Sequence, residues 1–260
     1  MRNNSTWARS PLSPTIWPRN AWSPWPTIFV FVGAVALFIV VQISYIVAAV
    51  MLHAIDPRAV TQIPVSQNLM LQFVSWGATG IYLVLVIPRA LGAPLETLGF
   101  RAPTPRDLGV AASGALVMVV LVNGAGTLAA ALSHRHDTEA AMALMHQLRT
   151  PEQRAAFTLL ACGVAPFCEE LVFRGFIFNA LTRFVPLSAA MVLSGAIFGV
   201  LHATDGWPGE LLTVGVPLTL GGILLAYVYA RTKCFWANVT THALFNAVSV
   251  VSVLFFHVSQ

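Results

Sequence analysis

Two adjacent carboxylates and an arginine interrupt an otherwise apolar stretch of the sequence. Glu169 and Glu170 follow Cys168, and Arg174 comes four residues after Glu170. An ionised side chain inside an apolar run that crosses a membrane costs at least a few kcal/mol. The other acidic residues all fall in or beside predicted loops: Asp56, Glu96, Asp107, Asp137, Glu139, Glu152, Asp205 and Glu210. Glu169 and Glu170 are therefore the leading candidates for chemistry.

Helical geometry separates the roles of the two glutamates. Successive residues of a helix differ by about 100° around its axis, so Glu169 and Glu170 cannot both face one pocket squarely. An acid four residues before a base is the favourable order for an ion pair within a helix. We therefore expect Arg174 to neutralise Glu170, while Glu169 faces the neighbouring helices.

Two later segments each place a histidine and a second residue on one helical face. These pairs are Phe198 with His202 and His242 with Asn246, each separated by four residues. A carboxylate, two imidazoles and an amide can together activate water and stabilise an oxyanion. Each residue alone has a structural alternative, because polar groups often bridge helices in membrane bundles. Their joint presence favours a catalytic site.

The composition indicates a membrane protein. Hydrophobic residues make up 57% of the chain and charged residues 9%, whereas a soluble chain carries roughly 25% charged residues. The net charge is +4, but the basic residues are scattered over predicted loops and form no basic run. This distribution argues against nucleic-acid binding. Cys162, Cys168 and Cys234 form no CxxC pair, so they indicate neither a disulfide framework nor a cysteine zinc site. Cys168 is a weak candidate nucleophile, because apolar surroundings hold a thiol protonated.

The apolar runs predict an all-α fold, a polytopic membrane helical bundle with about seven transmembrane helices. Residues 1–26, rich in proline and tryptophan, are predicted to form an irregular polar tail, and residues 27–260 a single transmembrane helical domain. The first span is too long for the apolar core of a cleaved signal peptide. The predicted spans cover residues 27–52, 66–87, 107–132, 151–183, 187–203, 211–230 and 235–257.

The connection between the third and fourth spans carries a further helical signal. Met142, Met145 and Leu148 recur at helical spacing, which predicts a short interfacial helix on the membrane surface. The connection also contains three histidines, but exposed loop histidines are mostly solvated, so we do not expect a metal site there: His134, His136 and His146.

The fourth span has a clear start and an internal proline. Thr150 is a capping residue, followed by proline at the first helical position and Gln153 at the third. Pro166 lies three residues before the glutamates and is expected to kink the helix. Because proline has no N–H, the carbonyl of Cys162 should lose its usual partner.

Lysine and arginine placement predicts the orientation. Nine basic residues lie on the side of the amino-terminus, namely Arg2, Arg9, Arg19, Arg89, Arg101, Arg106, Arg183, Arg231 and Lys233. Four lie on the other side: Arg58, Arg135, Arg149 and Arg154. The positive-inside rule then places the amino-terminus in the cytoplasm and, with seven spans, the carboxyl-terminus outside.

Three motifs in this order resemble the signature of the CPBP family, intramembrane proteases that include the type II CAAX prenyl endopeptidases and bacterial Abi-type proteins. They are Glu169-Glu170-x-x-x-Arg174, Phe198-x-x-x-His202 and His242-x-x-x-Asn246. The resemblance covers about residues 150–250, the motif core, and none of the first three spans.

The resemblance implies glutamate-dependent peptide hydrolysis within the membrane, without a metal or cofactor. Glu169 with His202 would polarise the attacking water, and His242 with Asn246 would stabilise the oxyanion. Supporting roles would fall to Glu170, Arg174 and Phe198. The implied partners are membrane lipids and a peptide or protein substrate, lipidated or not, and the expected location is a bacterial cytoplasmic membrane. The predicted boundaries place His202 near one end of its span and His242 in the opposite half of its own. Either these boundaries are several residues off, or the helices are tilted and unequal in length.

Two other interpretations stay open. The first is a zinc protease with Glu169, His202 and His242 as ligands and water as the fourth, since such sets do form catalytic zinc sites. Against it, Glu170 is expected to be committed to Arg174, which leaves no acid to support a ligating histidine. The second is a membrane peptide-binding or immunity protein that does not cut its ligand, although binding alone would not need buried ionisable groups.

Overall fold

The structure, a computed structural model, describes residues 24–59, 63–92, 94–135, 137, 139–203 and 208–256, and these residues contain helices and connections without a strand. The helices are α1 (Pro24–Met51), α2 (Val65–Leu91), α3 (Pro105–Ser133), α4 (Ala140–Met145), α5 (Pro151–Leu159), α6 (Ala165–Glu170), α7 (Asn179–Leu181), α8 (Leu187–His202), α9 (Val216–Thr232) and α10 (Phe235–Phe256). Three segments are wider π-helix: η4 (Leu160–Val164), η5 (Leu171–Phe178) and η6 (Leu211–Gly215). Two short 3₁₀ turns lie in connections: η2 (Pro57–Ala59) and η3 (Leu95–Leu98).

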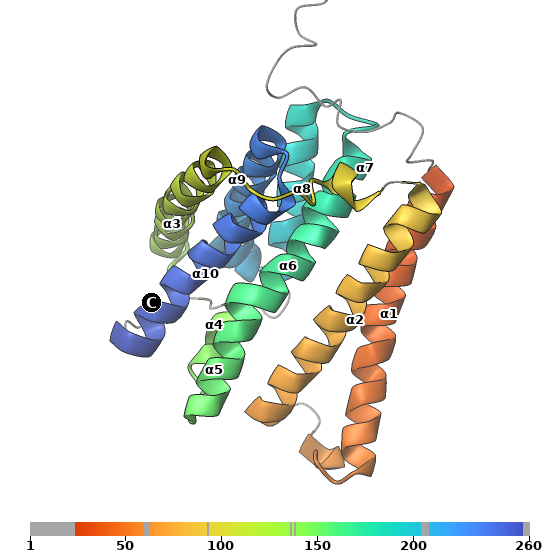
Figure 1. Ribbon diagram of the computed structural model, residues 1–260. Coiled ribbons are helices and arrows are strands. Elements are labelled where there is room, and N and C mark those ends of the chain that lie inside the picture. The colour runs from red at the N-terminus through yellow and green to blue at the C-terminus, as the bar shows by residue number, and fades with distance from the viewer. Residues whose placement is uncertain are drawn as a thin grey trace, which may run out of the picture.

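The chain passes through the bundle in alternating directions (Figure 1). The segments from α5 to α7 join into one helical pass, Pro151–Leu181, and η6 continues directly into α9. Among the described residues, six passes are long and apolar enough to cross a membrane, while α8, also apolar, has only 16 residues. These findings confirm the predicted polytopic membrane bundle of about seven helices.

Two predicted boundaries are corrected by the structure. The first helix begins at Pro24 instead of residue 27, because proline is tolerated in the first turn of a helix. The rest of the predicted tail, residues 1–23, lies outside the described residues. The second helix continues through Pro88 to Leu91 and ends where Gly92 takes the left-handed conformation, with φ of 58°. A proline in the last turns removes one backbone hydrogen bond close to the helix end, which the helix survives.

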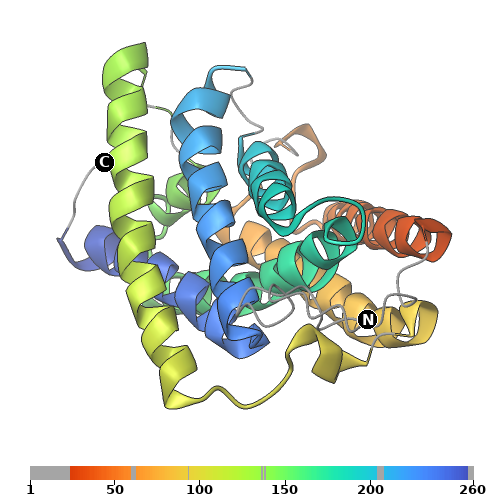
Figure 2. The same cartoon turned by 90° about the horizontal axis from the view of Figure 1, so that it is seen from above.

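The helices α8 and α9 approach each other closely through glycine. Gly195 and Gly199 lie one turn apart on α8, and a Cβ at Gly195 would stand only 2.7 Å from the Ile223 backbone nitrogen. A Cβ at Gly199 would stand 2.7 Å from the Thr219 nitrogen. Small residues at such crossings let two backbones meet in a membrane bundle. In Figure 2, α3, α9 and α8 follow one another across the molecule, and α1 with α2 forms a pair to one side.

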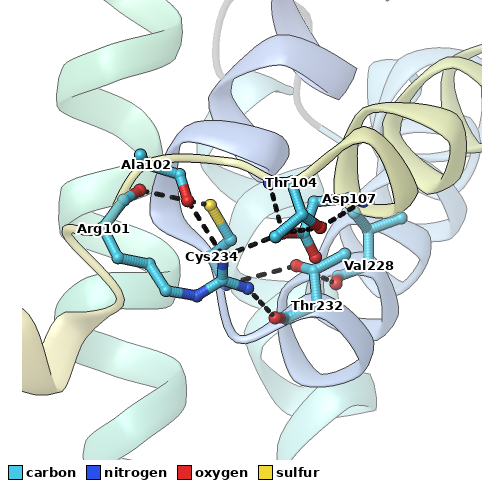
Figure 3. A network of polar contacts seen from close by, with 7 residues as sticks. All are labelled: Arg101, Ala102, Thr104, Asp107, Val228, Thr232 and Cys234. Carbon is cyan, nitrogen blue, oxygen red and sulfur yellow. Dashed lines mark hydrogen bonds and ion pairs between the residues drawn. The ribbon is translucent and has the colours of Figure 1, made fainter.

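A polar network fixes the start of α3 against the α9–α10 turn (Figure 3). Thr104 and Asp107 form a capping box at the first turn of α3. The guanidinium of Arg101 donates to Asp107 Oδ2 at 2.8 Å and to the Thr232 carbonyl at 2.7 Å. The turn that starts α10 is thereby held in place, and α10 carries His242.

The short helix expected between the third and fourth spans is present as α4. Met142 and Met145 of α4, with Leu148 just beyond it, pack in one cluster with Phe157 of α5 and with side chains of α2 and α10. The apolar residues that predict this helix therefore face into the bundle, and they hold α4 against residues of α2, α5 and α10.

The alternation of helices supports a testable topology. The ends of α2, α7 and α9 lie on the side where α1 begins. Among the described residues, helix order therefore places these basic residues on that side: Arg89, Arg101, Arg106, Arg183, Arg231 and Lys233. We expect an alkaline phosphatase fused after Gln260 to be active and a fluorescent protein at the same position to be dark, because the positive-inside rule puts this end outside. Fusions in the connection between α2 and α3 should give the opposite pair of signals. A bright fluorescent protein after Gln260 would contradict the predicted orientation.

Candidate active site

Glu169 and Glu170 lie in α6, near the middle of the long pass from Pro151 to Leu181, and they face different surroundings. Glu170 is fully buried, and Glu169 is 9% exposed and lines a cavity. This is the separation that the angle between successive helical residues predicts.

The carboxylate of Glu170 is shared by three side chains from two helices. Its Oε1 accepts from Arg174 Nη1 at 2.9 Å and from His242 Nδ1 at 2.8 Å. Its Oε2 accepts from the amide of Asn238. The second guanidinium nitrogen of Arg174 donates to the Gly222 carbonyl of α9 at 2.8 Å. One buried acid therefore joins the long pass to α9 and α10.

The predicted pairing of Glu170 with Arg174 is confirmed, but the expectation that it leaves Glu170 no capacity to support a histidine is wrong. A carboxylate has about four acceptor positions, and His242 occupies one of them beside the arginine. Asn238, the third partner of Glu170, is not part of any of the three sequence motifs. It lies four residues before His242, so the spacing of Asn238, His242 and Asn246 along one face of α10 was an available signal.

The two imidazoles are oriented in the same way by different acceptors. His202 Nδ1 lies 2.7 Å from the Phe198 carbonyl, and His242 Nδ1 contacts Glu170. Because carbonyls and carboxylates only accept, Nδ1 carries the hydrogen in both rings. The opposite nitrogens, Nε2, lie 3.9 Å (His202) and 3.8 Å (His242) from the same Oε2 of Glu169. These separations are too long for direct hydrogen bonds and are of the kind that a water molecule bridges.

The short length of α8 explains how His202 reaches Glu169. His202 is the last residue of this 16-residue helix, whereas His242 lies eight positions into the 22-residue α10 by its number. α8 ends beside the middle of the neighbouring pass, so its terminal residue meets a glutamate far from either end of that pass. Unequal helix lengths thus account for the difference in depth that the sequence suggested.

Phe198 packs between the charged pair and the histidines. Its ring centroid is 4.3 Å from that of His202 and 5.0 Å from the guanidinium carbon of Arg174. Phe173 meets the same ring edge-on at 4.9 Å. Phe198 is 2% exposed, so it helps to keep water from the pair and supports the His202 ring.

Asn246 donates a hydrogen bond to a backbone carbonyl that Pro166 leaves without its usual donor. In η4, the Ala165 N–H donates to the Leu160 carbonyl, five residues back. In this register the next carbonyl, that of Ala161, would take its hydrogen from residue 166, which is proline and has none. The amide nitrogen of Asn246 donates to this carbonyl at 2.7 Å. The carbonyl that accepts a hydrogen bond from another helix is therefore that of Ala161. The sequence predicted that the carbonyl of Cys162, one residue later, would lose its usual partner.

The cavity has a volume of about 270 Å³ and is bounded by five parts of the chain. Polar residues of α2 form one side, and α3, α4, the long pass and the α8–α10 helices form the rest. The polar lining consists of Asn68, Gln72, Glu139, Glu169, His202, His242 and Asn246, with apolar residues that include Trp76, Met118, Leu144, Phe157, Leu160, Phe198, Leu218 and Phe245.

Two acids assigned to loops by the sequence are not simply solvated. Glu210 is 3% exposed at the start of η6. Glu139 lines the cavity, and its pKa is raised by burial and by Glu169, while His202 and His242 act in the opposite direction. A loop has no regular spacing that would show whether a side chain faces the protein interior or the solvent. The burial of Glu139 and Glu210 could therefore not be predicted from the sequence.

Cys168 points away from this chemistry. Its thiol donates to the Trp76 carbonyl at 3.2 Å, the residue is 2% exposed, and it does not line the cavity.

Of the three histidines in the connection between the third and fourth spans, His136 lies outside the described residues. Within the described part of the chain, no three His, Cys, Asp or Glu side chains are grouped so that they could hold a metal ion.

Removing Arg174 should destabilise the fold. In the Arg174→Ala protein Glu170 loses the cation that balances its buried charge, which costs roughly 3–5 kcal/mol. We expect a sharp fall in the yield of monodisperse protein after detergent extraction, and a lower midpoint of thermal unfolding. The matched control is Arg183→Ala, an exposed arginine just beyond the same pass. Equal yields for the two variants would show that the pair is not a structural requirement.

The coupling between Asn246 and Pro166 is measurable as a double-mutant cycle. Asn246→Ala leaves the Ala161 carbonyl without its donor, a loss of about 1–3 kcal/mol in unfolding free energy. In a Pro166→Ala background the backbone regains an N–H, so the same change should cost at least about 0.5 kcal/mol less. Unfolding in mixed detergent micelles is the measurement, and strictly additive costs would contradict the assignment.

Comparison with known proteins agrees with the motifs. A family model described as "Type II CAAX prenyl endopeptidase Rce1-like" matches residues 151–248. A Bacillus subtilis (strain 168) protein named "Putative membrane peptidase YdiL" is 34% identical over 91 residues, which are 35% of this chain and 34% of that protein. An uncharacterized protein of Mycoplasma capricolum is 26% identical over 102 residues, 38% of this chain and 27% of its own length.

The chain thus matches about a third or less of the length of these curated relatives. No solved structure matches it significantly. The matched range contains all three motifs and agrees with the stretch on which the resemblance rests. Residues 151–248 of the chain are therefore similar to the Rce1-like type II CAAX prenyl endopeptidases, and this similarity covers less than half of the chain.

Proposed function

We propose that this protein is an intramembrane endopeptidase that hydrolyses a peptide bond with water activated by Glu169. The observation that carries the proposal is the convergence of two imidazole nitrogens on one carboxylate oxygen of Glu169, at 3.8 and 3.9 Å, inside a cavity of the membrane bundle. The match of residues 151–248 to an endopeptidase family model supports the same reaction class.

In the proposed reaction, a water molecule lies between Glu169 Oε2 and His202 Nε2. Glu169 takes a proton from this water as the oxygen attacks the carbonyl carbon of the substrate. The resulting oxyanion receives hydrogen bonds from His242, in its imidazolium form, and from Asn246. Collapse of the tetrahedral intermediate breaks the C–N bond, and Glu169 returns the proton to the leaving nitrogen, so that an acid and an amine are released.

The surrounding residues would hold these groups in place. Glu170 fixes the His242 ring through Nδ1, and Arg174 balances the charge of Glu170. Phe198 packs against His202. An amide nitrogen carries two hydrogens, so Asn246 can serve the Ala161 carbonyl with one and an oxyanion with the other.

The proposed substrate is a peptide or protein segment that is held in or at the membrane, lipidated or not. Apolar residues such as Met118, Phe157 and Leu218 line the cavity beside the polar groups and suit an apolar side chain or an acyl chain. Exposed apolar side chains on α1, among them Phe29, Ile39 and Ile43, suit contact with membrane lipids. We propose residues 27–260 as one domain in a bacterial cytoplasmic membrane, with the amino-terminus in the cytoplasm.

The test compares membranes that contain the wild-type protein with membranes that contain Glu169→Gln. We expect the substitution to abolish turnover, because an amide cannot take the proton of water, while the folded yield stays near that of the wild type. Mass spectrometry of protein termini should show cleavage products that appear only with the wild type. Cys168→Ala is the matched control and should retain turnover. Termini that are identical in wild-type and Glu169→Gln membranes would favour a peptide-binding protein without hydrolysis.

A zinc enzyme is the second candidate, and one observation favours it. Both histidines hold Nδ1 to an acceptor and present Nε2 to the same carboxylate, as ligating histidines do. The fit is imperfect, because ligands at 2.0–2.1 Å around a tetrahedral ion lie about 3.4 Å apart, whereas the atoms here are 3.8 and 3.9 Å apart. Stoichiometric zinc that is lost to a chelator together with activity, and restored with it, would establish this alternative.

A further inference from the structure

The charged lining of the cavity is entirely acidic. Glu139 and Glu169 both line it, and no lysine or arginine is among the described lining residues. Arg174 lies behind Glu170, is fully buried and is neutralised there. When both are ionised, the carboxylates of Glu139 and Glu169 outnumber the one imidazolium that the proposed reaction uses, so a substrate entering the cavity meets negative potential. A cationic group is favoured in such a place and a carboxylate is disfavoured.

Glu139 has no structural partner that explains its position. It stands at the amino-terminal cap of α4, yet its side chain makes no capping hydrogen bond. Within the described residues, no arginine or lysine forms an ion pair with it. Arg135, the nearest cation in sequence, is engaged by Asp137 through two contacts of 2.9 Å, and Asp137 also receives the Thr213 hydroxyl.

The backbone beside Glu139 is fixed, so its carboxyl is held at the site. α4 follows directly, and Met142 and Met145 of this helix, with Leu148 just beyond it, pack into the cluster around Phe157. Burial raises the Glu139 pKa, and the charges of His202, Glu169 and His242 also act on it. The carboxyl is thus within electrostatic reach of the candidate catalytic groups, and a cation brought beside it would relieve the cost of its ionisation.

We infer that Glu139 is a specificity-determining residue that binds a cationic group of the peptide substrate close to the scissile bond. The group is a lysine ammonium or an arginine guanidinium. The same carboxylate disfavours substrates that bring an acidic side chain into the cavity. This inference rests on the proposed peptidase function and assigns the substrate class of that site.

The first experiment measures cleavage by the purified full-length protein in liposomes. The probes are fluorogenic membrane-associated peptides that share one sequence and carry lysine, glutamine or glutamate at each position near the cleaved bond. In wild type, kcat/KM should be highest for a lysine peptide. Glu139→Gln should reduce the lysine-to-glutamine ratio of kcat/KM at least tenfold, and Glu139→Lys should favour glutamate over lysine. Glu152→Gln, an exposed acid at the start of α5, is the control and should keep the wild-type ratios.

The second experiment needs no hydrolysis and therefore separates this inference from the proposed function. Fluorescence anisotropy measures binding of the same peptides to Glu169→Gln and to Glu169→Gln/Glu139→Gln. The lysine peptide should bind the first protein at least tenfold more tightly than the glutamate peptide, and the second protein should lose this difference. Equal affinities, or no binding of any peptide, would overturn the inference. Unchanged kcat/KM ratios in Glu139→Gln, or one equal loss for all peptides, would overturn it too.

Discussion

The arrangement of the site depends on one buried carboxylate. Glu170 accepts hydrogen bonds from Arg174 of its own pass and from Asn238 and His242 of α10, while Arg174 reaches the backbone of α9. A buried charge without these partners would be strongly unfavourable, so the three helices are compelled to meet at this point. The imidazole of His242 is oriented by the same contact. Stability and the geometry of the candidate site therefore share a single interaction.

Irregular backbone brings the remaining groups to that point. Pro166 and the two π-helical segments on either side of α6 interrupt regular hydrogen bonding around the glutamates, and π-helical turns are frequent at functional sites. The carbonyl that Pro166 leaves without a donor is served by Asn246, which ties the defect to α10. The glycines of α8 let that helix lie against α9, and its early end delivers His202 to Glu169. Pro166, the π-helical segments and the glycines of α8 therefore lie at places where helices contact one another.

Local spacing explains what could be predicted from the sequence. The i,i+4 rule is geometric and acts within one helix, so it gives the Glu170–Arg174 pair and the opposite direction of Glu169. Hydropathy gives the number of helices, since apolar length is needed to cross a bilayer. Contacts between helices are not visible in such patterns. The bond from His242 to Glu170, the amide of Asn238 and the inward turn of Glu139 all join residues distant in sequence, or depend on the course of a connection.

The residues proposed for catalysis and many of the other residues that line the cavity come from different parts of the chain. The residues proposed for catalysis all lie within 151–248, the range that matches the endopeptidase family. Much of the remaining lining comes from earlier in the chain, namely Asn68, Gln72 and Trp76 of α2, Met118 of α3, and Glu139 with the start of α4. These earlier residues do not contact Glu170 or Arg174 through any hydrogen bond in the described structure, so they are free of the constraint that fixes the catalytic groups. Under the proposed function, substitutions in α2, α3 and the start of α4 can therefore change which substrate the cavity accepts, while the buried ion pair and the histidines stay unchanged.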